Sequence, residues 1–178
     1  TDFENISYTK YQGKKSKILV IFTEQKNMKM QNGKMFSTGN HPVEALLPML
    51  HLKNAGFDFE IATPTGKPVV FEMWAFPEKD EHVKAIFNEY KSSFEQPKKL
   101  QDFMETSLTE SSSYAAVFVP GGHGSMLGIP EDKNVGKILN WAHQNDLFTI
   151  SLCHGPGSFL ATTLNNQEFL YKGYHMCV

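Results

Sequence analysis

One cysteine of the chain, Cys153, directly follows a short apolar run and precedes a histidine and a glycine-rich turn. The run, residues 148–152, has the composition of a strand buried on both faces of a sheet. Gly155-Pro156-Gly157 predicts a sharp turn into a helix. A strand, a tight turn and a helix together lift a side chain above the sheet edge, and a helix N-terminus favours a thiolate. The pattern therefore favours a nucleophilic cysteine, although most lone cysteines in apolar runs are core residues.

Other chemically useful groups are expected at the same edge of the sheet. Glu44 falls in the first turn of a predicted helix, and Gly121-Gly122 follows the apolar run 115–119. Ligands of α/β sheets bind beyond the carboxyl ends of the strands, where these groups should converge with Cys153. The backbone N–H groups of Gly122 and His154 could bind a developing oxyanion. Two simpler interpretations stay open: Glu44 could only complement the helix dipole, and His154 could be satisfied by nearby backbone.

Alternating strand and helix patterns predict an α/β fold. Strands are expected at 17–22, 57–61, 115–119 and 148–152, and helices at about 42–55, 131–144 and 156–164. With right-handed crossovers this order gives a flavodoxin-like doubly wound parallel sheet. Residues 25–33 are expected to form a polar loop turning at Asn32-Gly33, and a last strand to begin at Tyr174.

Residues 68–109 interrupt this alternation. They hold two amphipathic patterns, at 83–94 and 100–108, within a stretch too long for a simple crossover. We interpret 68–109 as an inserted helical cap, and 1–67 with 110–178 as an α/β core that is incomplete at its C-terminus.

Composition narrows the class of protein. A length of 178 residues is typical of one α/β domain. The net charge of −2 does not indicate a protein that binds nucleic acid, because such proteins usually carry a positively charged surface. No apolar run is long enough to span a membrane and the N-terminus lacks an apolar signal region. Two cysteines make no disulfide framework, so a cytoplasmic protein is expected.

Three longer stretches carry a resemblance to a known family. They are residues 32–44 (NGKMFSTGNHPVE), 120–124 (PGGHG) and 151–156 (SLCHGP). In this order they resemble the ThiJ/PfpI superfamily, and within it the heat shock protein 31 group of chaperones, also described as glyoxalase III and protein deglycases. Residues 74–77 and 97–100 are similar to the inserted region of that group.

The resemblance implies an enzyme with Cys153 as nucleophile, His154 as its neighbouring base or acid, and Glu44 as a carboxylate contacting the thiol. Its implied reaction is the conversion of methylglyoxal to lactate without glutathione, together with related deglycation of proteins and nucleotides. The resemblance also implies a stress-related holding chaperone for unfolded proteins, a homodimer, and no cofactor.

Two departures from the group's pattern are expected to matter. The third catalytic residue of the group is an Asp shortly after the strand in which Val178 lies, so we expect the active protein to continue past Val178. Bacterial members bind a metal through two histidines and a carboxylate, and the aligned residues here are Lys53, Asp58 and Tyr90. A lysine and a tyrosine are poor replacements for histidine, so we expect no metal and a Lys53–Asp58 ion pair.

Other functions were weighed against this one. A glutamine amidotransferase is disfavoured, because its nucleophilic cysteine lacks an adjacent histidine. An intracellular cysteine protease of the same superfamily is a closer alternative, disfavoured only if residues 68–109 cover the thiol. A non-enzymatic holding chaperone is the alternative of a different class, and it would expose large apolar patches.

Overall fold

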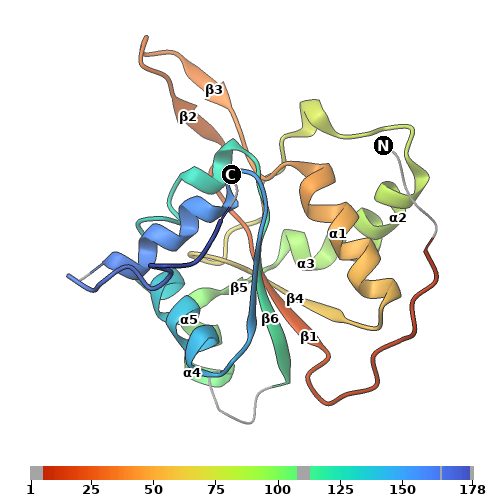
Figure 1. Cartoon of the computed structure of the whole chain (residues 1–178). Coiled ribbons are helices and arrows are strands. Elements are labelled where there is room, and N and C mark those ends of the chain that lie inside the picture. Colours follow the sequence, from red (N-terminus) through yellow and green to blue (C-terminus); the bar gives the residue numbers. More distant parts are fainter. Residues whose placement is uncertain (1–5, 108–112, 165, 177–178) are drawn as a thin grey trace.

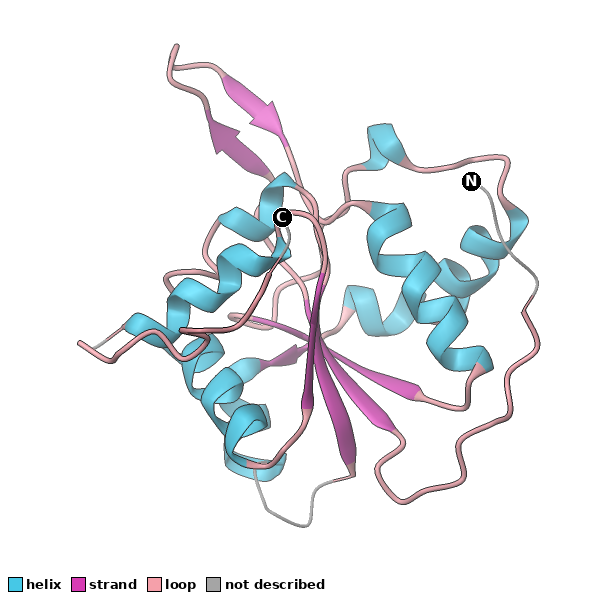
Figure 2. Ribbon diagram, in the orientation of Figure 1, coloured by secondary structure: helices cyan, strands magenta, loops and turns pink. Residues whose placement is uncertain are grey.

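The fold is built on one parallel sheet (Figures 1 and 2). The structure is a computed structural model and describes residues 6–107, 113–164 and 166–176. The five strands of the main sheet are β1 (Lys17–Ile21), β4 (Asp58–Thr63), β5 (Lys98–Lys99), β6 (Tyr114–Val119) and β7 (Phe148–Ser151). Their order is β5-β4-β1-β6-β7 and every neighbouring pair is parallel. The chain leaves β1 in one direction for β4 and β5 and then in the other for β6 and β7, which confirms the doubly wound fold.

Helices cover both faces of this sheet, as Figure 1 shows. On one side lie α1 (Pro42–Asn54), α2 (Glu81–Glu89) and α3 (Lys91–Glu95); on the other lie α4 (Leu100–Ser107), α5 (Lys133–Gln144) and the 3-10 helix η3 (Gly155–Thr163). Alternate residues of β1 supply the two cores: Ile18 and Val20 pack on the α1 side, and Leu19 and Ile21 pack on the α5 side. Burial on both faces explains the uninterrupted apolar character of β1.

Some predicted elements differ in detail. The expected loop at 25–33 is instead the first part of an antiparallel hairpin, β2 (Asn27–Lys29) and β3 (Met35–Ser37), that turns at Asn32-Gly33. The hairpin projects away from the main sheet (Figure 1). The pattern at 83–94 is divided at Tyr90 between α2 and α3. The helix after Cys153, predicted as an α-helix, is a 3-10 helix along its whole length.

The segment 68–109 is joined to the core near both of its ends. Residue Phe71 pairs with Asn40 in an isolated parallel bridge, and β5 extends the main sheet beside β4. Between them lie the short 3-10 helix η1 (Met73–Ala75), α2 and α3. The assignment of 68–109 as an inserted cap stays a prediction, but its last part, β5 and α4, lies within the layers of the main fold.

The last strand expected from the sequence is not seen at its beginning. Residues 174–176 are exposed and make no strand, and residues 177–178 lie outside the described part of the chain. Among the described residues, β7 has no neighbouring strand on its outer edge. Within the described residues, no helix is both long and apolar enough to cross a membrane.

Candidate active site

Cys153 lies immediately beyond the carboxyl end of β7 in a strained turn. Its φ is 50°, a left-handed value that costs a non-glycine residue on the order of 1 kcal/mol. The turn is closed by the Gly155 N–H, which donates to the Leu152 carbonyl oxygen at 2.7 Å. A Cβ at Gly155 would lie 2.5 Å from the Ser151 hydroxyl, so this position requires glycine. The strained, exposed thiol confirms the predicted strand–turn geometry.

Glu44 lies against the Cys153 thiol, as predicted. It is held in the first turn of α1, which His41 caps at its N-terminus and Pro42 opens. The His41 backbone N–H donates to the Gly121 carbonyl oxygen at 3.0 Å, and this bond joins the start of α1 to the loop after β6. Glu44 Oε2 is buried and meets no hydrogen-bond donor among the described residues. An acid that only complemented a helix dipole would face solvent, so the buried Oε2 atom of Glu44 favours a role at the thiol.

The environment of Cys153 raises the pKa of its thiol. Desolvation of the sulfur is the largest cause and the negative charge of Glu44 is the second. The backbone N–H groups of His154 and Gly122 act in the opposite direction, since both stabilise the thiolate. The expectation that the following helix would make the thiolate the favoured form is therefore wrong, because the carboxylate and the partial burial outweigh the amides.

Removing the Glu44 charge should shift the titration of the thiol. In Glu44→Gln the repulsion between carboxylate and thiolate is absent, so the thiolate forms more easily and the pKa of Cys153 falls. The measurement is the rate of alkylation by iodoacetamide between pH 6 and pH 10. We expect its midpoint to move to lower pH in Glu44→Gln. Glu24→Gln, a change at the distant Thr65 loop, is the matched control and should leave the midpoint in place. An unchanged or higher midpoint in Glu44→Gln would contradict the proposed contact.

His154 and two backbone amides complete the surroundings of the sulfur. The His154 Nδ1 atom lies 3.4 Å from Cys153 Sγ, within reach for transfer of the thiol proton. Gly122, with φ 105°, presents its N–H toward the same sulfur. A Cβ at Gly122 would lie 2.6 Å from the Gly39 carbonyl oxygen. The two amides predicted to bind an oxyanion thus converge on the nucleophile, although their role in a reaction stays a prediction.

A carboxylate–imidazole pair that was not predicted from the sequence lies beside this site. His123 Nδ1 lies 2.8 Å from Oε1 of Glu72, and the His123 ring centroid is 5.1 Å from that of His154. Glu72 is fully buried and comes from the segment assigned to the cap. His123 belongs to the Pro-Gly-Gly-His motif, which was interpreted only for its glycines. A histidine in this motif already indicates a possible site residue, but nothing in the sequence predicts that Glu72 is its partner.

Positioning of Glu72 depends on Asn40. The Asn40 side chain is buried, donates to the carbonyl oxygens of Thr23 and Val70, and accepts from the Thr23 N–H. The Glu72 N–H in turn donates to the Asn40 carbonyl oxygen at 2.9 Å. Asn40 therefore holds the end of β1, the start of α1 and the segment of Glu72 together, which explains its place in the motif at 32–44.

The residues aligned with the metal ligands form a network of side chains. Lys53 pairs with Glu89 at 2.6 Å and donates to the Tyr90 hydroxyl at 3.1 Å. The Tyr90 hydroxyl donates to Asp58 in a short hydrogen bond, and desolvation together with this bond raises the pKa of Tyr90 to about 12. The expected direct ion pair between Lys53 and Asp58 is therefore replaced: Tyr90 connects the two, and Glu89 is the partner of the lysine.

We predict that the purified protein holds no stoichiometric zinc at this network. The Lys53 ammonium pairs with Glu89 and donates to Tyr90, and a neutral phenol is a weak zinc ligand. Elemental analysis after dialysis is the measurement. One zinc per chain that Lys53→Ala or Asp58→Ala removes would contradict the prediction. Among the described residues, no group of three or more His, Cys, Asp or Glu side chains is arranged to hold a metal.

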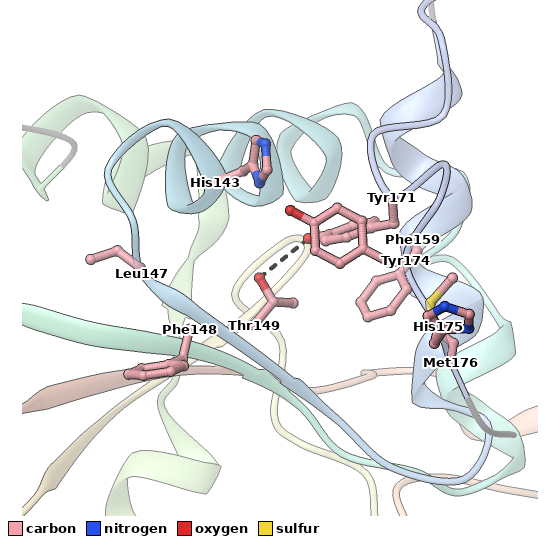
Figure 3. Close-up of a pocket in the computed structure, with 9 residues that line it drawn as sticks. All are labelled: His143, Leu147, Phe148, Thr149, Phe159, Tyr171, Tyr174, His175 and Met176. Carbon is pink, nitrogen blue, oxygen red and sulfur yellow. Dashed lines mark hydrogen bonds between the residues drawn. The ribbon is translucent and has the colours of Figure 1, made fainter.

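A separate pocket lies at the edge of β7 (Figure 3). It has a volume of about 330 Å³ and is lined by His143, Leu147, Phe148, Thr149, Phe159, Tyr171, Tyr174, His175 and Met176. The Tyr171 hydroxyl donates to Thr149 Oγ1 at 3.2 Å, the bond drawn in Figure 3. Neither Cys153 nor Glu44 lines this pocket, so we assign no part of the thiol chemistry to it.

The fold and the site together define an α/β protein with a cysteine in a strained turn after β7. The chain is 50% identical over 177 residues to the protein/nucleic acid deglycase HchA of Escherichia coli O157:H7 (strain EC4115 / EHEC), covering 99% of this chain and 62% of that protein. It is 49% identical to the protein of the same name from Pseudomonas aeruginosa (strain UCBPP-PA14), covering 100% of this chain and again 62% of the relative. The chain thus spans about three fifths of the length of these relatives. No protein-family profile matches it.

Solved structures of other proteins share the fold of this chain. Glyoxalase III from Candida albicans superposes with a TM-score of 0.65 at 26% identity, over 90% of this chain and 64% of that one. Rapid Encystment Protein 24 KDa of Francisella tularensis superposes with a TM-score of 0.70 at 18% identity, over 87% of this chain and 66% of that one, which shows a shared fold. These comparisons confirm the resemblance to the heat shock protein 31 group that the motifs indicated.

Proposed function

We propose that the protein is an enzyme that converts methylglyoxal, or a related 2-oxoaldehyde, to the 2-hydroxy acid without glutathione, with related deglycase activity. The single observation that carries the proposal is the meeting of Cys153, His154 and Glu44 at the end of β7. The sulfur lies 3.4 Å from an imidazole nitrogen and against a carboxylate with a buried, unpartnered oxygen. The 50% identity to proteins named deglycases supports the same chemistry.

The first step uses the thiol and its neighbouring base. His154 takes the thiol proton through Nδ1, the sulfur attacks the aldehyde carbon C1, and the new alkoxide at C1 takes that proton back to give a hemithioacetal. The N–H groups of Gly122 and His154 stabilise the charge on this oxygen while it exists. Because the pKa of Cys153 is raised, proton removal by a base has to accompany the attack at neutral pH.

Subsequent steps move hydrogen between the two carbons. Glu44 removes the hydrogen of C1 and returns it to C2, which changes the hemithioacetal into a 2-hydroxyacyl thioester. Water then hydrolyses the thioester, releases the 2-hydroxy acid and restores the thiol. No oxidant or cofactor is needed, since the oxidation of C1 balances the reduction of C2.

The test is lactate formation from methylglyoxal in glutathione-free buffer, with free cysteine at the same concentration as the reference for uncatalysed thiol chemistry. The proposal expects lactate at a rate that saturates with substrate. Loss of methylglyoxal without lactate would contradict it.

We further propose that the protein is a homodimer and that it is located in the cytoplasm. The cytoplasmic location is supported by a sequence with only two cysteines.

A holding chaperone is the second candidate, and one observation favours it. Met35, Met73 and Trp74 are 62%, 53% and 61% exposed, and Trp74 Nε1 donates to the Ser37 carbonyl oxygen. The hairpin and η1 thus present a shared surface of exposed apolar side chains, suited to unfolded protein.

A cysteine protease is an alternative in the same class of enzyme, because Cys153 is exposed and residues 68–109 therefore do not bury it.

A further inference from the structure

We propose that His123, held by the buried Glu72, is a further catalytic acid–base residue of the thiol site. The inference rests on the proposed function and deepens it: His123 would carry the hydroxyl proton that the hydrogen shift from C1 to C2 leaves to be moved. Glu72 would be its positioning residue.

The first argument is that Glu72 fixes which nitrogen of His123 is free. Glu72 Oε1 accepts the His123 backbone N–H at 3.2 Å and the Thr38 hydroxyl at 3.3 Å, and it lies 2.8 Å from His123 Nδ1. Since Oε1 already acts as an acceptor, the hydrogen of the third contact belongs to the ring nitrogen. His123 is therefore the Nδ1–H tautomer. Its Nε2 atom carries no hydrogen and can accept a proton.

The second argument is the placement of the ring. The His123 ring lies between two others: Phe36 packs against it edge-on at 5.2 Å between centroids, and His154 lies at 5.1 Å with the planes tilted by 33°. The His123 side chain is nevertheless 41% exposed, in contrast to Glu72, which is 0% exposed. The imidazole is thus fixed beside the residue that contacts the sulfur and remains open to a small molecule bound there.

A third observation is that only one oxygen of the Glu72 carboxylate is used in hydrogen bonds. Its Oε2 atom is buried and finds no hydrogen-bond partner among the described residues, and leaving a buried carboxylate oxygen unsatisfied destabilises the fold. A cost of this kind at the edge of a reactive site is typical of groups retained for chemistry.

The step assigned to His123 follows from the balance of protons. When Glu44 moves the hydrogen from C1 to C2, the oxygen on C1 must lose its proton to become the thioester carbonyl, and the oxygen on C2 must gain one. We assign this transfer to Nε2 of His123, which takes the proton from the oxygen on C1 and gives it to the oxygen on C2. Both residues then return to their starting states and no other reactant is consumed.

The decisive variant is His123→Asn in the full-length protein. The asparagine amide reaches about as far as Nδ1 and can still donate to Glu72, but it has no atom at the position of Nε2. We expect lactate formation to fall by about 10²-fold or more, the usual contribution of a general acid–base group, while iodoacetamide alkylates Cys153 at the wild-type rate. His143→Asn, at the separate pocket, is the matched control and should keep wild-type turnover.

Glu72→Gln tests the positioning residue by a readout that folding alone would not move. In ¹⁵N NMR spectra we expect the Nδ1–H tautomer of His123 in the wild type and a shift toward Nε2–H in Glu72→Gln, with reduced turnover. Wild-type lactate formation in His123→Asn, or an Nε2–H tautomer in the wild type, would overturn the inference alone. A wild-type protein that makes no lactate would refute the proposed function, and the inference with it.

Discussion

Cys153→Ala should abolish lactate formation from methylglyoxal, with a loss of at least about 10⁴-fold, since removing the nucleophile of a covalent mechanism leaves only binding and electrostatic contributions. The structure supports so large an effect because His154 and Glu44, together with the N–H groups of His154 and Gly122, surround this one sulfur. The measurement is the rate of lactate release at saturating methylglyoxal, without glutathione.

Cys177→Ala is the matched control, because Cys177 is the other cysteine of the sequence, and it should retain wild-type turnover.

A second assay on the same variants separates the two candidate functions. It measures how far each variant suppresses the aggregation of a heat-denatured protein. We expect Cys153→Ala to retain this suppression, since the apolar surface of Met35, Met73 and Trp74 is unchanged. Wild-type lactate formation in Cys153→Ala would refute a cysteine mechanism.

Gly121→Ala is expected to have the second largest effect, through the geometry of the site rather than its chemistry. A Cβ at residue 121 would overlap Glu44 Oε2 and would lie 2.7 Å from Cys153 Cβ and 2.9 Å from the Leu152 carbonyl oxygen. Glu44 and the Cys153 turn cannot both keep their places. We expect a loss of turnover of about 10²-fold, the scale of a misplacement near 1 Å, and a destabilisation of about 1–3 kcal/mol from overpacking.

Gly157→Ala is the control for this prediction. It lies in the same turn region, but a Cβ there would approach nothing closer than Pro130 Cγ, at 4.0 Å. Thermal unfolding followed by circular dichroism should show a lowered Tm in Gly121→Ala and a nearly unchanged Tm in Gly157→Ala. Equal Tm and turnover in both variants would mean that Glu44 and Cys153 do not meet across Gly121.

Much of this site could be predicted from the sequence because its parts lie at the ends of strongly patterned elements. The apolar run before Cys153 and the Pro42 start of α1 fix where the thiol and Glu44 emerge, and the parallel sheet brings those ends together. Gly121 and Gly122 could be expected there as well, since the motif places them directly after β6.

The parts that could not be predicted depend on contacts between distant segments. The sequence separates Glu72 from His123 by 51 positions, and the contacts of residues 70–72 with Asn40 bring the carboxylate to the site. The raised pKa of Cys153 also depends on the desolvation of its sulfur and on the balance between a carboxylate and two amides, which the sequence does not reveal. The polar pattern at 25–33 concealed a hairpin, because its three-residue strands are too short to show an alternation.

The central claim is that one thiol, Cys153, carries the conversion of a 2-oxoaldehyde to a 2-hydroxy acid. The most direct measurement is a titration of the full-length wild-type protein with iodoacetamide, in which the alkylated fraction of Cys153 is determined by peptide mass spectrometry and lactate formation is assayed at each point. The account predicts that lactate formation falls in direct proportion to the unmodified fraction and reaches zero when Cys153 is fully alkylated. Lactate formation that persists after complete alkylation of Cys153 would contradict it.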